Sequence, residues 1–436
     1  MRIVMEPSEY TLLNIGDTAM LEVAFARLRA LFPDATIEVF TDDAKRLVSY
    51  CPSAVPLNLR GREIWLRDGY LFAWLYRLLS KNGITVHLRE LERSLRRRWP
   101  SFAALPIRLR AKLTSGDSED VNVYLRSISK ADLMVVSGMG GITDVFKDYA
   151  LEVLDNLALA IRRGIPTAMF GQGIGPIQDP TLKARAKEVL PSVDLIALRE
   201  GRAGGPLLEL LGVPSNRVLI TGDDAIEIAY RSRAGELGNA LGINLRAACY
   251  SEVDHMFIEE MRPVIQKAAT MRKVPIIPIP ISQIPGEDDA LTIERLMTGC
   301  HEMSDARERA VTRSKVLERI RGCRVVVTGS YHAGVFALAQ GVPVVGLAKS
   351  DYYCDKFLGL AGQFGTGCEV VLLKDSGWPI KLTTAIDRLW QLAEQMRSEL
   401  LDAAAHQLEL SRAAYQHFHR LMSSKIDQRR LDYMGI

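Results

Sequence analysis

The sequence predicts an α/β protein made of two similar lobes that face one another, and three observations support this fold class. The chain has 436 residues, more than one hydrophobic core normally organises, so two domains are expected. Short apolar runs alternate with longer stretches of helical periodicity, the pattern of a parallel sheet flanked by helices. Comparable numbers of these runs lie before and after a polar break, RSRAGELGN, between Asp223 and Gly242.

The expected strands are short and apolar, and most end in Gly, Ser or Thr, where the chain turns toward a helix. They are residues 37–40, 133–137, 167–170, 195–198 and 218–221 in the first lobe, and 242–245, 276–279, 325–328 and 344–347 in the second. Ligands of such sheets bind beyond the carboxyl ends of the strands, so the loops there are the candidate site.

Domain boundaries follow from the same pattern. We expect the first lobe to cover residues 1–230 and the second to cover residues 240–375. Helices from 380 to 436 would then either cross back to the first lobe or mediate a homodimer.

Composition excludes several classes of protein. With 48% hydrophobic and 25% charged residues, the chain is neither disordered nor fibrous, and a net charge of +3 does not indicate nucleic-acid binding. Six cysteines without a C-x-x-C pair predict neither a metal site nor a disulfide framework, and they suit a reducing cytosol. Neither a signal peptide nor an apolar run of membrane-spanning length is evident. We therefore expect a cytoplasmic protein without a metal or cofactor.

Residues 60–112 differ from the rest of the chain, because they contain thirteen Lys or Arg against four acidic residues, interleaved with aromatic ones. YLFAWLYRLL and LRELERSLRRRW are interpreted as amphipathic helices of an insert, about 60–115, in the first lobe. Basic residues beside aromatic ones suit an anionic or membrane-associated substrate, which would place the protein at the inner membrane face. A solvated helical insert whose aromatic side chains pack on the lobe explains the same composition.

The motif NIGDTAML near the N-terminus opens an expected helix. Gly16 would let the backbone approach a ligand closely, and helix N-termini attract anions. Asp17 fits as the N-cap of this helix, or as a contact to substrate beside Asn14.

Two glycine-rich segments follow expected strands. GMGGITD, with Gly140, Gly141 and Asp144, is expected to form a loop whose backbone N–H groups suit phosphate or a sugar ring. It matches neither the Walker loop nor the dinucleotide fingerprint, and a tight strand-to-helix turn is the alternative. GQGIGP, with Gln172 and Gly173, is the second such segment.

Charged residues stand at the ends of strands in both lobes. Arg199 follows the strand at 195–198, where its planar guanidinium can grip a carboxylate or phosphate, unless it forms a surface ion pair with Glu200 or Asp194. Asp223 is expected at the same rim. Arg246 ends a strand of the second lobe.

His332 begins an expected helix just beyond the turn T-G-S-Y. The positive end of a helix disfavours protonation, so we expect a neutral imidazole that can act as general base or acid. This position, in a glycine-flanked loop at the carboxyl end of a strand, favours a functional histidine over a structural one.

Taken in order, NIGDTAML, GMGGITD, GQGIGP, DLIALR, ITGDDA, GINLR and YHAGVFALAQGVPVVGLA resemble the polysaccharide pyruvyl transferase family. The motifs extend from about residue 11 to 365 and so cover most of the chain. The resemblance implies a GT-B-like fold, with two Rossmann-like lobes facing a central cleft. It also implies transfer of the pyruvyl group of phosphoenolpyruvate onto two sugar hydroxyls of a cell-surface glycan or its lipid-linked precursor.

The resemblance also implies roles for individual residues. His332 matches the histidine of the family and would be the acid or base, while Arg199 and Arg246 would bind the donor. Ser330 stands where the family has an arginine, two residues before the histidine. The downstream lysine of the family corresponds to either Lys349 or Lys356 in KSDYYCDKF.

Two other functions remain open. A GT-B glycosyltransferase that uses a nucleotide sugar would need a carboxylate for the ribose, for which the cluster from Glu287 to Asp289 is the candidate, although it is more simply a helix N-cap. A binding protein that kept the fold and lost the chemistry would explain the missing arginine at Ser330.

Overall fold

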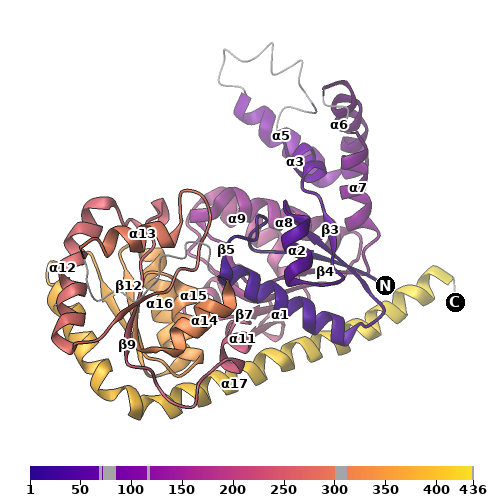
Figure 1. Cartoon of the computed structure of the whole chain (residues 1–436). Coiled ribbons are helices and arrows are strands. Elements are labelled where there is room, and N and C mark those ends of the chain that lie inside the picture. Colours follow the sequence, from indigo (N-terminus) through magenta and orange to yellow (C-terminus); the bar gives the residue numbers. More distant parts are fainter. Residues whose placement is uncertain (68–70, 72–84, 115–117, 300–311, 435–436) are drawn as a thin grey trace.

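A computed structural model of the chain describes residues 1–67, 71, 85–114, 118–299 and 312–434. These residues form two lobes, each built on a parallel sheet, and a long C-terminal helix that touches both (Figure 1). The helix expected at YLFAWLYRLL lies outside the described residues except for Leu71.

The first lobe contains a parallel sheet in the order β3-β2-β1-β4-β6-β7-β8, with β5 pairing to β6. The order reverses beside β1, and at such a switch point a doubly wound sheet opens a crevice for ligands. The strands are β1 (Arg2–Glu6), β2 (Thr36–Phe40), β3 (Val55–Leu57), β4 (Leu133–Val136), β5 (Met139–Ile142), β6 (Thr167–Ile174), β7 (Leu195–Leu198) and β8 (Val218–Ile220).

The second lobe contains a smaller parallel sheet in the order β10-β9-β11-β12-β13, whose switch point lies between β9 and β11. Its strands are β9 (Ala240–Asn244), β10 (Ile276–Pro278), β11 (Cys323–Thr328), β12 (Val344–Ala348) and β13 (Cys368–Leu372). Because the residues of β9 and β12 are fully buried, these strands read as continuous apolar runs in the sequence.

Helices cover the sheets and form the insert. In the first lobe they are α1 (Ile15–Leu31), α2 (Ala44–Tyr50), α3 (Arg60–Leu66), α5 (Thr85–Arg98), α6 (Pro100–Thr114), α7 (Ser118–Ser129), α8 (Lys147–Arg162), α9 (Pro180–Val189), α10 (Gly204–Leu210) and α11 (Ile226–Arg231). The second lobe adds α12 (His255–Arg272), α13 (Asp289–Leu296), α14 (Arg313–Arg321), α15 (Tyr331–Ala339) and α16 (Asp351–Phe364), and the chain ends in α17 (Trp378–Met434). No helix in the described ranges is both long and apolar enough to cross a bilayer.

The glycine-rich segments differ from the prediction. Residues 139–142 of GMGGITD form strand β5, and GQGI continues strand β6 instead of forming a loop. The two segments pair with one another as parallel strands, with Met139 opposite Gln172 and Ile142 opposite Ile174. The two segments therefore belong to the sheet, which a reading of each segment alone could not reveal. Strands β1, β3 and β13 were also absent from the prediction.

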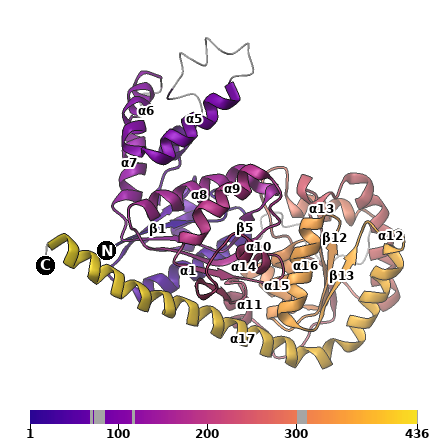
Figure 2. The ribbon, with the colours of Figure 1, turned by 180° about the vertical axis from the view of Figure 1, so that it is seen from behind.

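Helix α17 runs back from the second lobe along the first (Figures 1 and 2). It is one helix of 57 residues, about 85 Å long at the usual rise, and it includes the whole of the long helix that the sequence predicts from Leu382 to about Lys425. On the first lobe, the ring of Tyr415 stacks on Phe170 with 3.7 Å between ring centroids. The Tyr415 hydroxyl donates to the buried carboxylate of Asp224 at 2.7 Å, so α17 ties the two lobes together.

The lobes also meet at the start of α1. The N–H of Ile15 donates to the carbonyl of Ile281 at 2.9 Å, and the N–H of Gln283 donates to the carbonyl of Leu13 at 2.9 Å. These bonds form a short antiparallel bridge between Asn14 and Ser282. The N-terminus of α1 is thereby held at the boundary between the lobes.

Candidate active site between the lobes

A cavity of about 340 Å³ lies between the two lobes. The first lobe contributes the segment after β1, the start of α1, strand β5 and the end of β7; the second contributes the end of β9 and the starts of α15 and α16. Of the residues predicted from the sequence, those that line this cavity are Asn14, Asp17, Gly140, Gly141, Arg199, Arg246, Ser330, His332 and Lys356.

His332 lies in the first turn of α15, just after β11, and is 8% exposed. Its Nε2 atom is buried and has no hydrogen-bond partner among the described residues, while the carboxylate of Asp223 lies 3.8 Å away. Burial, followed by the nearby cations Arg199 and Lys356, lowers the pKa of His332 well below its usual range. The imidazole is therefore neutral at neutral pH and available to accept a proton.

Gly16 leaves room for the imidazole of His332 because it has no side chain. A Cβ atom at Gly16 would lie 2.0 Å from Cγ of the imidazole, so only glycine lets α1 and α15 approach this closely. The close approach predicted for Gly16 thus occurs with a side chain of the other lobe.

Arg199 follows β7 and is 2% exposed. Its guanidinium lies over the Tyr331 ring, 4.0 Å from the centroid, and Nη1 lies 3.5 Å from the carboxylate of Asp223. Its Nη2 atom is buried without a hydrogen-bond partner in the described part of the chain. The surface ion pair considered for Arg199 is therefore wrong: Glu200 instead accepts from the backbone of Arg202.

The glycine strands make room for the cations. A Cβ atom at Gly140 would lie 2.6 Å from Nη2 of Arg199 and 2.9 Å from Nζ of Lys356. One at Gly173 would lie 2.8 Å from Nε of Arg199. Glycine within a strand commonly marks such a close approach, so these two positions shape the site without binding through a loop.

Arg246 reaches the cavity from the second lobe and is held rigidly. Its Nε and Nη2 atoms both donate to the carboxylate of Asp289 at 2.8 Å, a buried bidentate ion pair. Asp289 also accepts from the backbone of Ile281 and Ser282, so its oxygens are occupied. Such a pair fixes the orientation of the guanidinium toward the cavity.

The other two residues of the acidic cluster, Glu287 and Asp288, make different contacts. Asp288 caps α13 by accepting from the backbone N–H of Ala290 at 2.8 Å. Glu287 lines the cavity and accepts from the hydroxyl of Tyr250 at 2.5 Å. The cluster therefore offers the cavity one carboxylate, Glu287.

The two candidate lysines lie in different places. Lys356 lines the cavity, with Nζ 3.9 Å from the centre of the Tyr352 ring and within hydrogen-bond reach of the Tyr352 hydroxyl. Burial and then Arg199 lower the pKa of Lys356 well below its usual range. Lys349 lies over the ring of Phe257 at 4.7 Å and does not line the cavity.

The N-cap of α1 is Asn14, and the prediction of Asp17 as N-cap is wrong. The helix begins at Ile15, and the side chain of Asn14 accepts from the backbone of Gly16 at 3.0 Å and of Asp17 at 3.4 Å. Asp17 instead sits in the first turn and lines the cavity. Burial, with Glu9 as the second cause, raises its pKa to about 6.

Besides Gly16, Gly173 and Lys349, three predicted residues stand outside the cavity lining. Asp144 fastens a turn by accepting from the backbone of Gln178 and Asp179, and Gln172 donates to main-chain carbonyls at 2.7 and 2.8 Å. Asp223 lies behind the site, between Arg199 and His332. Burial raises the pKa of Asp223 to about 6.

Aromatic residues of the cavity were missing from the prediction. They are Tyr10, Phe146, Tyr149, Tyr250, Tyr331, Tyr352 and Tyr353. Tyr352 joins the lobes by donating to the carbonyl of Gly140 at 2.9 Å. In the sequence, Tyr331 stands beside His332, and Tyr352 and Tyr353 stand in KSDYYCDKF, close to other predicted site residues. Spacing alone, however, does not distinguish a residue that lines a cavity from one in the core.

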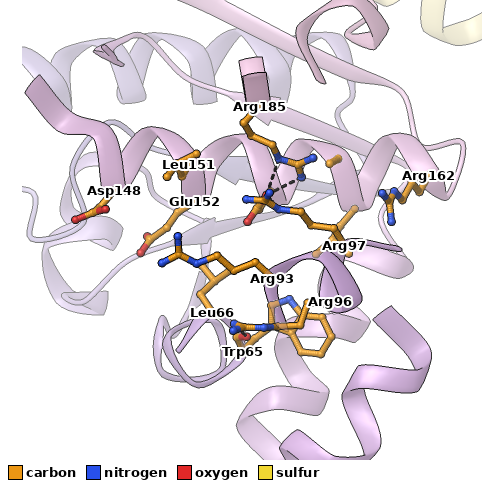
Figure 3. A pocket seen from close by; sticks show the side chains of 13 residues that line it. Trp65, Leu66, Arg93, Arg96, Arg97, Asp148, Leu151, Glu152, Arg162 and Arg185 are labelled. Atoms are coloured by element: carbon orange, nitrogen blue, oxygen red, sulfur yellow. Dashed lines mark hydrogen bonds and ion pairs between the residues drawn. The ribbon is translucent and has the colours of Figure 1, made fainter. Parts of the chain in front are cut away.

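A second cavity, of about 320 Å³, lies between α5 of the insert and helices α8 and α9 (Figure 3). Arginines dominate its lining, and two of them share one acid: Arg97 and Arg185 bind Asp155 at 3.1 and 2.6 Å. The cavity does not include His332, and the Arg97–Asp155 pair attaches the insert to the lobe.

Comparisons with known proteins agree with this architecture. The UDP-GlcNAc 2-epimerase from Neisseria meningitidis, solved with UDP-GlcNAc bound, is similar with a TM-score of 0.55 at 10% identity, covering 98% of this chain and 100% of that one. A putative UDP-N-acetylglucosamine 2-epimerase from Listeria monocytogenes gives a TM-score of 0.54 at 11% identity, with coverages of 92% and 90%. A glycosyltransferase from Rickettsia africae gives a TM-score of 0.50 at 10% identity, covering 97% of this chain and 98% of that one. At such identities the likeness concerns the fold alone, and it confirms the predicted GT-B-like arrangement.

At the level of sequence, none of the curated proteins compared matches the chain. The model of the polysaccharide pyruvyl transferase family, in contrast, matches residues 14–351, a range that includes the start of α1, the switch point of the second sheet and His332. The chain belongs to the polysaccharide pyruvyl transferase family.

Proposed function

We propose that this protein transfers the pyruvyl group of phosphoenolpyruvate onto two hydroxyls of a sugar, in a cell-surface glycan or its precursor. One observation carries the proposal beyond membership of the family. Arg199 from the first lobe and Arg246 and Lys356 from the second line one cavity together with a neutral His332.

The donor carries a carboxylate and a phosphate, and both need cationic partners. Nη2 of Arg199 is buried and unpartnered among the described residues, so an anion at that position would supply the missing acceptor. Arg246 is oriented by Asp289, and Lys356 adds a third cation. Ser330 lies in the same lining and contributes a small hydroxyl in place of a fourth cation.

The reaction balances without water or a redox partner. One sugar hydroxyl gives its proton to His332 and bonds to C2 of phosphoenolpyruvate, while the methylene carbon takes up a proton from Asp17, which makes a methyl group. The C2–O bond to phosphate then breaks, and phosphate leaves with its bonding electrons. The second hydroxyl bonds to the same carbon and gives its proton to Asp17, which closes the cyclic ketal, while the imidazolium of His332 gives its proton to the departing phosphate.

Two groups of the cavity suit the proton transfers. The neutral imidazole of His332 accepts the hydroxyl proton, and Asp17, whose pKa is raised to about 6, donates to the methylene carbon. Asp223, 3.8 Å from Nε2 of His332, positions and stabilises the imidazolium that forms. The cations stabilise the departing phosphate.

The test is phosphate release from phosphoenolpyruvate in the presence of a panel of sugar acceptors, with direct measurement of donor binding. We expect His332→Gln to bind the donor and to lose phosphate release, whereas Lys356→Ala loses binding and the matched Lys349→Ala keeps both. A protein that UDP-GlcNAc stabilises against heat, and phosphoenolpyruvate at millimolar concentration does not, would contradict the proposal. That result would favour a nucleotide-sugar donor with Glu287 at the ribose.

A further inference from the structure

Helix α6 of the insert has apolar side chains on two opposite faces. The inner face is buried in the core of the insert and consists of Ala103, Ala104, Ile107 and Ala111. The outer face carries four large side chains, here called the outer stripe: Phe102, Leu105, Leu109 and Leu113. Their spacing of three, four and four residues stacks them along one side of the helix.

The outer stripe is strongly exposed. Its four members are 71%, 71%, 63% and 79% exposed in chain order. Single exposed leucines occur on most proteins, but a contiguous apolar row on one helix marks a contact surface. A helix that only covered its own lobe would carry polar residues on this side.

Basic residues border the stripe. On the helical wheel Arg108 and Lys112 fall on one edge and Arg110 on the other, and Arg98 and Trp99 precede the helix. Trp99 is 55% exposed, and the guanidinium of Arg98 lies 5.6 Å from the centre of its ring. Residues 85–114 contain eight Lys or Arg against two acidic residues, while the whole chain carries only +3. Arg98, Arg108, Arg110 and Lys112 lie on or just before α6, whereas Arg93, Arg96 and Arg97 line the second cavity.

Helix α6 lies in the projecting part of the insert (Figures 1 and 2). The insert projects from the first lobe on the side away from α17, with α5 and α6 at its far end (Figures 1 and 2). Helix α6 has 15 residues, about 22 Å at the usual rise, which suffices to lie along a surface.

We propose that the outer stripe of α6 docks the protein on the surface of an anionic lipid bilayer. The apolar row enters the boundary between headgroups and acyl chains, and the bordering Arg and Lys side chains extend to the lipid phosphates. A second copy of the chain is a poorer occupant, because a symmetric contact would set the same basic edges against each other. This inference does not rest on the proposed reaction.

The experiment measures sedimentation of the full chain with vesicles of phosphatidylcholine, with and without phosphatidylglycerol. We expect binding to the anionic vesicles only, weakened by added salt. Leu105→Gln with Leu109→Gln should lower the partition coefficient by about tenfold or more. The matched control, Leu210→Gln with Ile380→Gln, changes leucine and isoleucine of similar exposure (64% and 74%) elsewhere and should bind like the wild type.

Charge variants provide an independent measurement. Arg98→Gln and Lys112→Gln should each lower binding to anionic vesicles by about fivefold. They leave the apolar row intact, so they remain informative if the double leucine variant fails to fold.

Three outcomes would overturn the proposal. The first is a wild type that ignores anionic vesicles, and the second is a double leucine variant that binds as tightly as the control. The third is a wild-type dimer, seen by light scattering, that only the stripe variant dissociates, because a second copy would then cover α6.

Discussion

The imidazole of His332 lies against the backbone of Gly16, on the other lobe, so closely that a methyl group there would sit 2.0 Å from the ring. The contact brings the first turn of α1 against the first turn of α15. It thereby couples the position of the proposed base to the closure of the two lobes.

We predict that Gly16→Ala abolishes turnover. Alanine itself favours a helix, so the loss must come from displacement of His332 or separation of the lobes, at a cost of about 1–3 kcal/mol in stability. Phosphate release and thermal melting measure the two effects. Gly362→Ala in α16 is the control, because a Cβ atom there meets nothing within 4 Å; equal behaviour of both variants would refute the role of Gly16.

Donor binding should be accompanied by proton uptake near neutral pH. Burial first and Arg199 second lower the pKa of Lys356, and a donor anion bound beside the two cations opposes the effect of Arg199. Calorimetric titration with phosphoenolpyruvate in buffers of different ionisation enthalpy measures the uptake. Lys356→Met should reduce it, and a binding enthalpy that is the same in every buffer would contradict the prediction.

Titration of Asp17 should make the stability of the protein depend on pH. Its pKa is raised from 3.8 to about 6 in the folded protein, so the folded chain holds a proton that the unfolded chain has lost between these values. The contribution of the protonated Asp17 carboxyl to the free energy of unfolding is therefore present below pH 4 and is lost as the pH rises to about 6.

The measurement compares melting temperatures of the wild type and Asp17→Asn from pH 4 to 8. The gain of the variant over the wild type should grow up to about pH 6 and then stay level, because above that pH the buried carboxylate is fully charged. Asp34→Asn, at an exposed position, should show no such trend. A gain independent of pH would show that ionisation of Asp17 is not its cause.

The attachment of α17 to the first lobe should depend on Tyr415. Removing its ring in Tyr415→Ala loses the stack on Phe170 and leaves the buried Asp224 without one donor, which costs about 3–5 kcal/mol. Urea unfolding followed by tryptophan fluorescence measures the change. Leu410→Ala on the more exposed side of the same helix should cost less than about 1 kcal/mol, and similar losses in both variants would exclude a special role of Tyr415.

The sequence by itself determined the fold class, because buried parallel strands leave apolar runs that can be read without the structure, as at 325–328 and 344–347. It also placed Arg199, Arg246 and His332 at strand ends, and the carboxyl ends of parallel strands meet at one edge of a sheet. Local patterns of this kind depend on neighbours along the chain, so one sequence suffices to recognise them.

Only the tertiary structure decided which neighbours those residues have. Lys356 lines the cavity and Lys349 does not, although they lie seven residues apart in one motif. Gly140 proved to be a strand residue that makes room for Arg199. Such roles depend on contacts between segments far apart in the chain, and the spacing of residues within one segment carries no information about them.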